Sequence, residues 1–288
     1  MEPSILTNLI MPLSTAVIML GMGLSLRTID FKRIFVAPLP IIIGLIGQII
    51  LLPLVGYSLA VLFALPAAHA VGLMILVACA GGAASNLIVY LAKADVALSV
   101  SLTALSSLIT IMTIPLVVNF ALREFIQIDN VTQLPLGTTN LKLFVITVIP
   151  MLVGMFLLHR YPNKARLWEL WISRFTYVFV TILLAFVFVQ NNQIIFNHYD
   201  VIGISAYLLN VITMGSGFLL ATLARLNMKQ KLSISIEIGV QNGFMAIFIA
   251  VTLLGDTSYV VFPAFYGVIM YINVLLMLMV FNKKKRMS

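Results

Sequence analysis

Long apolar runs separated by short polar connections fill the chain from end to end. Each run has roughly the 20 residues that a membrane-spanning helix needs, which is far longer than an ordinary β-strand. The pattern predicts an all-α membrane protein with nine transmembrane helices. These are expected over residues 4–26, 36–64, 69–92, 96–122, 140–159, 174–192, 201–224, 231–254 and 258–281.

The composition supports a membrane location. Of the 288 residues, 62% are hydrophobic and 9% are charged, whereas soluble domains are about 45–50% apolar and 25% charged. No basic residue precedes the first apolar run, so this run is expected to remain as a span and not to be a cleaved signal peptide. Because the connections are short, we expect one transmembrane domain over residues 1–288 and no separate soluble domain.

The basic residues are distributed unevenly between the two ends of the predicted spans. Fifteen of the 17 Lys and Arg residues flank one side, and only Arg123 and Lys142 flank the other. The positive-inside rule then places the N-terminus outside and the C-terminus in the cytoplasm. The net charge of +8 is thereby explained as a topology signal, so we expect no nucleic-acid partner. A bacterial cytoplasmic (inner) membrane is the expected location.

Glu237 is the one acidic residue predicted to lie within a span. A charge at that depth costs several kcal/mol unless a cation, a proton or a water-lined cavity compensates it. No Lys or Arg is predicted within any span. A mobile cation is therefore the simplest counter-charge, and a protonated or paired structural Glu237 is the alternative.

Two predicted spans carry polar interruptions flanked by glycine, at Gly81–Asn86 and at Gly239–Gly243. Such interruptions are typical of broken helices whose free backbone groups line a ligand site, although small residues also serve helix packing. At 1.5 Å per residue, Glu237 and Asn86 lie about 9 and 10 Å from the nearest cytoplasmic lysines. The two breaks can meet at one depth, and their spans run in opposite directions, as an inverted repeat requires.

Further oxygen donors lie near these breaks. Ser99, Thr103, Ser106 and Thr110 recur along one helical face, and for the last two a bond to their own helix is equally expected. Gln48 is either another donor or an interhelical hydrogen-bonding residue. Carboxylate, amide, hydroxyl and carbonyl oxygens suit a hard cation, and sodium is the natural candidate. No Ser–His pair or HExxH motif is present, and we expect no enzyme.

The sequence around these residues resembles the bile acid:sodium symporter family. The segments that carry the resemblance are Gly21–Leu26, Gly81–Asn86, Val96–Thr103 and Glu237–Asn242. The resemblance implies an inverted-repeat transporter with two discontinuous crossing helices and a panel domain that moves against a core domain. The core would comprise spans over about 36–122 and 201–281, and the panel spans over about 4–26, 140–159 and 174–192.

The resemblance also implies two sodium ions. The first would be bound by Ser85, Asn86, Ser99, Thr103 and Glu237. The second would be bound by Gln48, Glu237, Gln241 and the backbone carbonyls of Ile238 and Val240. Substrate would be bound near Asn242, Ala83, Tyr271 and Asn273.

The expected function is sodium-coupled symport of an organic anion by alternating access. The anion would be bile-acid-like or a small carboxylate such as pantoate. One alternative is a proton-coupled or uncoupled carrier of the related auxin-efflux or arsenite-efflux type. Another is a membrane sensor that binds an anion without moving it. Besides sodium, the anion and the lipid bilayer, no obligate protein partner is evident.

Overall fold

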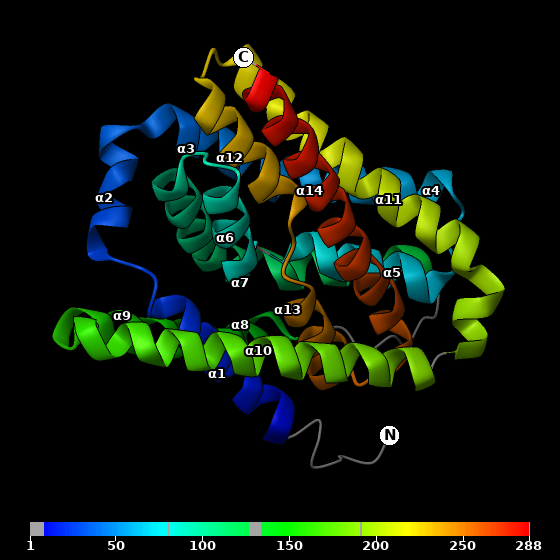
Figure 1. Ribbon diagram of the computed structural model, residues 1–288. Coiled ribbons are helices and arrows are strands. Elements are labelled where there is room, and N and C mark those ends of the chain that lie inside the picture. The colour runs from blue at the N-terminus through cyan, green and yellow to red at the C-terminus, as the bar shows by residue number, and fades with distance from the viewer. Residues whose placement is uncertain (1–8, 80, 127–133, 191, 288) are drawn as a thin grey trace.

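All regular secondary structure that the computed structural model describes is helical, which confirms the all-α prediction (Figure 1). The structure describes residues 9–79, 81–126, 134–190 and 192–287. The α-helices are α1 (Met11–Gly23), α2 (Thr28–Val36), α3 (Pro38–Ile46), α4 (Leu52–Leu62), α5 (Ala67–Ala78), α6 (Ala83–Leu91), α7 (Val96–Ile126), α8 (Leu136–Leu143), α9 (Ile149–Arg160), α10 (Pro162–Gln190), α11 (Asn192–Leu223), α12 (Met228–Gly239), α13 (Gly243–Phe248) and α14 (Val261–Met287). Short π-helical segments η2 (Gly47–Leu51), η3 (Phe144–Val148) and η4 (Ile249–Leu253) and the 3₁₀ segment η5 (Thr257–Val260) join some of them.

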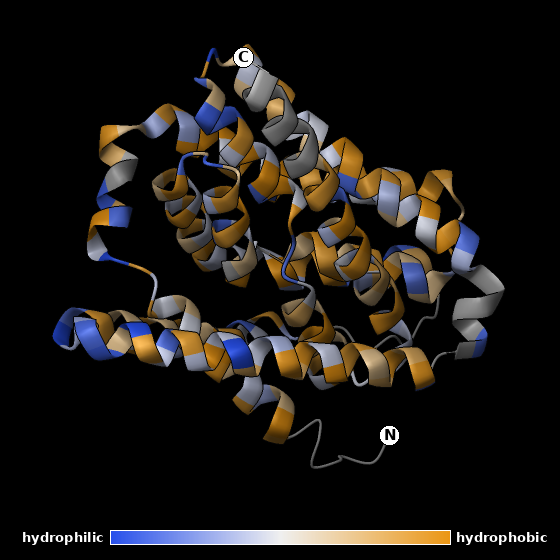
Figure 2. Cartoon of the chain, in the orientation of Figure 1, coloured by the Kyte–Doolittle hydropathy of each residue, from blue (hydrophilic) through white to orange (hydrophobic). Residues whose placement is uncertain are grey.

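Seven helical stretches in the described ranges are long and apolar enough to cross a membrane, and most of their length is coloured as hydrophobic in Figure 2. They are Pro38–Leu62, Val96–Ile126, Leu136–Arg160, Pro162–Gln190, Tyr199–Leu223, Met228–Leu253 and Thr257–Met277. Helices α1 and α5 are apolar but shorter. The chain therefore has the helices of an integral membrane protein, while the count of nine spans stays a prediction.

Two of the predicted polar connections, those before the spans expected at 36–64 and 174–192, contain helix. Helix α2 occupies the connection after the first span, and α10 begins at Pro162, twelve residues before the predicted start at residue 174. Proline is well suited to the first position of a helix, and the Lys, Ala, Arg, Leu and Glu residues that follow are strong helix formers. Trp168 and Trp171 consequently lie on α10.

Both predicted helix breaks are present. Helix α5 ends at Ala78 and α6 begins at Ala83, while α12 ends at Gly239 and α13 begins at Gly243. The extended segment between α12 and α13 is visible in Figure 1. Cys79 (φ −80°, ψ 139°) and Val240 (φ −102°, ψ 105°) have extended backbones at the two breaks. Backbone groups there leave the helical hydrogen-bond ladder and become available to other partners.

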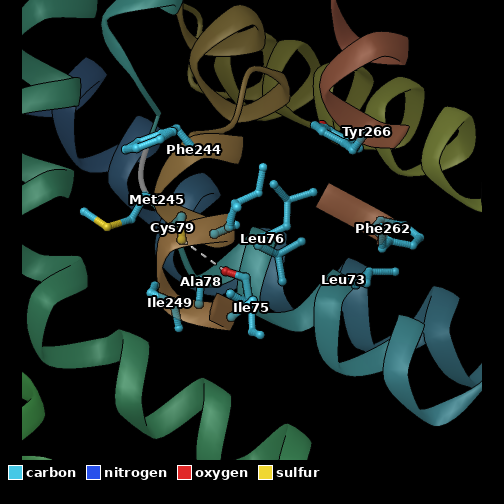
Figure 3. Close-up of a cluster of buried hydrophobic side chains, with 14 of the residues drawn as sticks. Leu73, Ile75, Leu76, Ala78, Cys79, Phe244, Met245, Ile249, Phe262 and Tyr266 are labelled. Carbon is cyan, nitrogen blue, oxygen red and sulfur yellow. Dashed lines mark hydrogen bonds between the residues drawn. The ribbon is translucent and has the colours of Figure 1, made fainter. Parts of the chain in front are cut away.

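The apolar core joins the two broken helices to α14. Side chains of α5, α13 and α14 meet in the cluster of Figure 3, in which Leu76, Phe244 and Phe262 are drawn. Cys79 lies in the same cluster and donates to the carbonyl of Ile75 at 3.2 Å. Elsewhere, α1 and α9 are in very close contact. A Cβ on Gly23 would overlap the Met151 carbonyl oxygen, so this contact requires glycine. Small residues allow such close crossings between apolar helices.

Candidate functional site

The carboxylate of Glu237 lies at the centre of the site and is fully buried on the last turn of α12. Its Oε1 accepts hydrogen bonds from Ser85 Oγ (2.7 Å) and from Ser99 Oγ. Its Oε2 accepts from Thr103 Oγ1 (2.9 Å) and, more weakly, from Gln48 Nε2 (3.4 Å). These donors are all neutral. A buried carboxylate held only by neutral donors still lacks the counter-charge that burial of an ion normally requires.

Three separate elements bring these donors to Glu237. Ser85 lies in the first turn of α6, directly after the first break. Ser99 and Thr103 are one turn apart on α7 and so project from the same face. One turn earlier, two reciprocal hydrogen bonds set the register of α7 against α12. Asp95 N donates to Ser233 Oγ (2.9 Å), and Ser233 Oγ donates to Asp95 O (3.0 Å).

Gln48 lies on the π-helical segment η2. Pro53 follows this segment, and a proline removes the hydrogen bond to the carbonyl four residues earlier. The resulting wide turn is of the kind that often occurs at functional sites. It directs Gln48 towards α12, where its Nε2 donates to the Glu237 carbonyl at 2.9 Å.

The hydroxyl groups around Glu237 have too few protons for the oxygens they contact. Ser85, Ser99 and Thr103 supply one proton each. The acceptors within hydrogen-bond distance are Gly82 O, Asn86 Oδ1, Ser99 O, Glu237 Oε1 and Glu237 Oε2. Ser99 Oγ, for example, approaches both Asn86 Oδ1 (2.7 Å) and Glu237 Oε1. Clustered oxygens that share too few protons are suited to a cation.

A second group of oxygens lies on the break side of Glu237. Gln241 Nε2 donates to the Ile238 carbonyl at 2.7 Å. Within the described residues, Gln48 Oε1 and Gln241 Oε1 are buried and accept no hydrogen bond. Buried polar atoms are rarely left unpaired in folded proteins, so these two amide oxygens point to a ligand.

Gly81 allows this second group to come together. A Cβ at this position would lie 3.1 Å from Glu237 Oε2, 3.4 Å from the Val240 carbonyl oxygen and 3.5 Å from Gln48 Nε2. Only a glycine leaves the space between these three groups open. The two helix breaks thus meet here, as their predicted depths required.

The row of hydroxyl groups on α7 divides into two parts. Ser99 and Thr103 contact Glu237, as described above. Ser106 Oγ donates to the Thr103 carbonyl and Thr110 Oγ1 to the Ser107 carbonyl, both at 3.3 Å. For Ser106 and Thr110, the alternative of bonding to their own helix is therefore the observed one.

The residues predicted to bind substrate are separated in the structure. Asn242 caps α13 by accepting from Met245 N at 3.1 Å, and it lines a pocket. Asn273 instead donates to Asn210 at 3.0 Å, and Tyr271 is 42% exposed. The side chain of Ala83 lies outside the described part of the structure. The pocket is lined by Met19, Ser107, Thr110, Ile111, Ile114, Leu143, Thr147, Asn242 and Met245.

Sequence reasoning missed several polar residues of this pocket. Ser107 lies next to the predicted row of hydroxyl groups but off its spacing. Thr147 lies on η3, a second π-helical segment followed by a proline, Pro150. A Pro shortly after a polar residue within a predicted span was the available signal for both Gln48 and Thr147.

Comparison with known proteins gives consistent matches. The profile of the Sodium Bile acid symporter family matches residues 12–198. The chain is 29% identical over 226 residues to an uncharacterized sodium-dependent transporter of Bacillus subtilis, covering 78% of this chain and 68% of that protein. It is 29% identical over 245 residues to the human ileal sodium/bile acid cotransporter, covering 83% and 68%.

A probable chloroplast sodium/metabolite cotransporter of Oryza sativa is 30% identical over 253 residues, which cover 86% of this chain. The match spans 59% of the rice protein. The chain therefore spans less than two thirds of the length of this chloroplast relative.

Proposed function

Because the chain belongs to the sodium bile acid symporter family, we propose that it couples sodium entry to the uptake of an organic anion by alternating access. Its relatives are transporters, not enzymes. The observation that carries the proposal is the fully buried carboxylate of Glu237, which is held by neutral donors among oxygens that share too few protons. A sodium ion supplies the missing positive charge.

The oxygen groups on the two sides of Glu237 support two ion sites. The first site is assigned to Ser85, Asn86, Ser99, Thr103 and Glu237, where the shortage of protons is found. The second is assigned to Gln48, Gln241, Glu237 and the carbonyls of Ile238 and Val240, where two amide oxygens lack partners among the described residues. Hard oxygen donors of this kind suit sodium better than a transition metal.

The substrate is assigned to the pocket at Asn242. Asn242 directly follows Gln241, so a single helix break would contact both the anion and the second sodium ion. Three hydroxyl groups and one amide provide the polar lining, and these groups can hydrogen-bond the carboxylate and hydroxyl groups of an organic anion. Ala83, Tyr271 and Asn273 stay candidates for contact in another state of the transport cycle.

The position of this pocket supports a division into core and panel. It lies between α1 and the α8–η3 segment on one side and α7 and α13 on the other. Helices α1, α9 and α10 contact one another and would form the panel, and the core would comprise the remaining spans. Rocking of one group against the other would expose the pocket alternately. The uneven distribution of basic residues supports an outer N-terminus and a cytoplasmic C-terminus, which an odd number of spans such as nine satisfies. We assign the protein to a bacterial inner membrane.

The driving ion tests the proposal directly. An inward sodium gradient is expected to drive uptake of labelled pantoate or taurocholate into proteoliposomes, and an equal potassium gradient is not. Flux driven by a pH gradient without sodium would favour a proton-coupled carrier. Saturable binding of either anion without any flux would favour a membrane sensor.

Two serines on α7 provide a matched pair of variants. Ser99→Ala removes a hydroxyl that contacts the carboxylate, whereas Ser106→Ala removes one that only bonds its own helix. A hydrogen bond to a charged group contributes about 1.5–3 kcal/mol, so Ser99→Ala should raise the half-maximal sodium concentration for uptake at least about tenfold. Ser106→Ala should leave it unchanged. Equal sodium dependence in the two variants would remove Ser99 from the ion site.

A further inference from the structure

The carbonyl of Gly239, the last residue of α12, is held from outside its own helix. It accepts a hydrogen bond from Asn210 Nδ2 at 2.8 Å and another from the Tyr266 hydroxyl at 2.6 Å. Asn210 belongs to α11 and Tyr266 to α14, and both side chains are fully buried. Two donors therefore hold this carbonyl at the point where the helical ladder stops.

A neighbouring amide fixes the orientation of Asn210. Asn273 Nδ2 donates to Asn210 Oδ1 at 3.0 Å, so the oxygen of Asn210 faces Asn273 and its NH₂ group faces Gly239. The two ends of an asparagine amide are assigned from such contacts. Asn210 Nδ2 also lies 3.1 Å from the Tyr266 hydroxyl, which links all three side chains.

Helix α11 also holds the preceding turn of α12. Ser235 Oγ donates to the Met214 carbonyl at 2.7 Å. A Cβ on Gly239 would overlap Met214 Cγ, so the two helices are in direct contact here. The end of α12 cannot shift relative to α11 without loss of these contacts.

The held carbonyl lies between the two carbonyls assigned to sodium, those of Ile238 and Val240. Successive carbonyls of an extended segment point in opposite directions, and Val240 is extended. With the Gly239 carbonyl turned towards α11 and α14, the Val240 carbonyl faces the space beside Gly81, Glu237 and Gln48.

From this arrangement we propose that Asn210 and Tyr266 are positioning residues for the second sodium site. By holding the Gly239 carbonyl, they keep the carbonyl of Val240 directed at the ion. The inference rests on the proposed function, since it assumes that sodium binds at this break. Neither residue contacts the ion itself.

The test measures the thermal stability of the detergent-purified full chain as the sodium concentration is raised. Potassium replaces sodium at the lower concentrations, so that the ionic strength stays constant. A ligand that binds the folded state raises its stability, so the titration reports sodium affinity. Tyr266→Phe removes one hydroxyl and keeps the ring. The half-maximal sodium concentration is expected to rise about two- to tenfold, as for the loss of one neutral hydrogen bond. Asn210→Leu should have the same effect.

Asn119→Ala is the control for a loss that is only structural. Asn119 also bonds a backbone, donating to the Leu134 carbonyl (2.9 Å) and accepting from Leu134 N (2.8 Å). It lies 16 residues along α7 from Thr103, or about 24 Å. This variant should lower thermal stability in both salts without changing the sodium midpoint.

The outcomes separate the inference from the proposed function. Sodium-dependent stabilisation in the unaltered protein with unchanged midpoints in both variants would overturn the role of Asn210 and Tyr266 alone. An unaltered protein that shows no sodium-dependent stabilisation would overturn both. Should Asn210→Leu not fold, Tyr266→Phe decides alone.

Discussion

Replacing Glu237 with Gln is expected to abolish sodium-driven uptake. The carboxylate accepts from Ser85, Ser99, Thr103 and Gln48, and an amide offers one acceptor oxygen in place of two and no negative charge. Removing one partner of a buried charge pair costs about 3–5 kcal/mol, so sodium affinity should fall at least about 100-fold. Uptake in proteoliposomes at fixed sodium measures the loss.

Thermal stability separates this loss from misfolding. In potassium, the Glu237→Gln protein should be at least as stable as the unaltered one, because burying a neutral amide costs less than burying a carboxylate. In sodium, the unaltered protein should gain about 2.7 kcal/mol at a concentration 100 times its Kd, and the variant should gain nothing. Undiminished sodium-driven uptake in this variant would contradict the assignment of the ion to Glu237.

The second large effect is expected from adding a single methyl group at Gly81. The Ala Cβ would lie 3.1 Å from Glu237 Oε2 and 3.4 Å from the Val240 carbonyl oxygen, where it occupies the space between the ligands of the second ion. We expect Gly81→Ala to lose binding of that ion and to reduce sodium-driven uptake at least tenfold. A change in the sodium Hill coefficient of uptake, from above one towards one, would show that one of two sites is lost.

Gly82→Ala is the matched control in the same helix break. The three atoms nearest to a Cβ on Gly82 would all belong to Asn242, at 3.7–3.8 Å, which is ordinary van der Waals contact. This variant should retain the sodium midpoint of thermal stability. If the Gly82→Ala and Gly81→Ala proteins lose sodium response equally, the break is merely sensitive to any added side chain, and the second site is not where we place it.

The helix breaks were predictable from the sequence, because their signals are local. In both Gly81–Asn86 and Gly239–Gly243, glycine is followed by two adjacent polar residues that end in Asn, and Glu237 lies two residues before the second break. Helix periodicity likewise placed Ser99 and Thr103 on one face. Features that depend on residue spacing within one helix therefore followed from the chain alone.

Features that depend on contacts between distant helices were not predictable. Asn210 and Tyr266 are ordinary residues of apolar helices until α11 and α14 bring them to Gly239. The place of Ser107 in the pocket lining similarly depends on how α7 lies beside η3. The early start of α10 was missed for another reason, since the span was predicted to begin with the apolar run at residue 174, whereas the helix also includes the polar residues before it.

The sequence separation within the site has a consequence for biosynthesis. Every side chain that donates to the Glu237 carboxylate precedes it by at least 134 residues. At a synthesis rate of about 5–20 residues per second, the hydroxyl groups of α6 and α7 leave the ribosome about 7–30 s before their acceptor. The hydroxyl groups of the earlier helices therefore have no hydrogen bond to Glu237 until α12 is inserted. Completion of the site is a late step in the assembly of the protein.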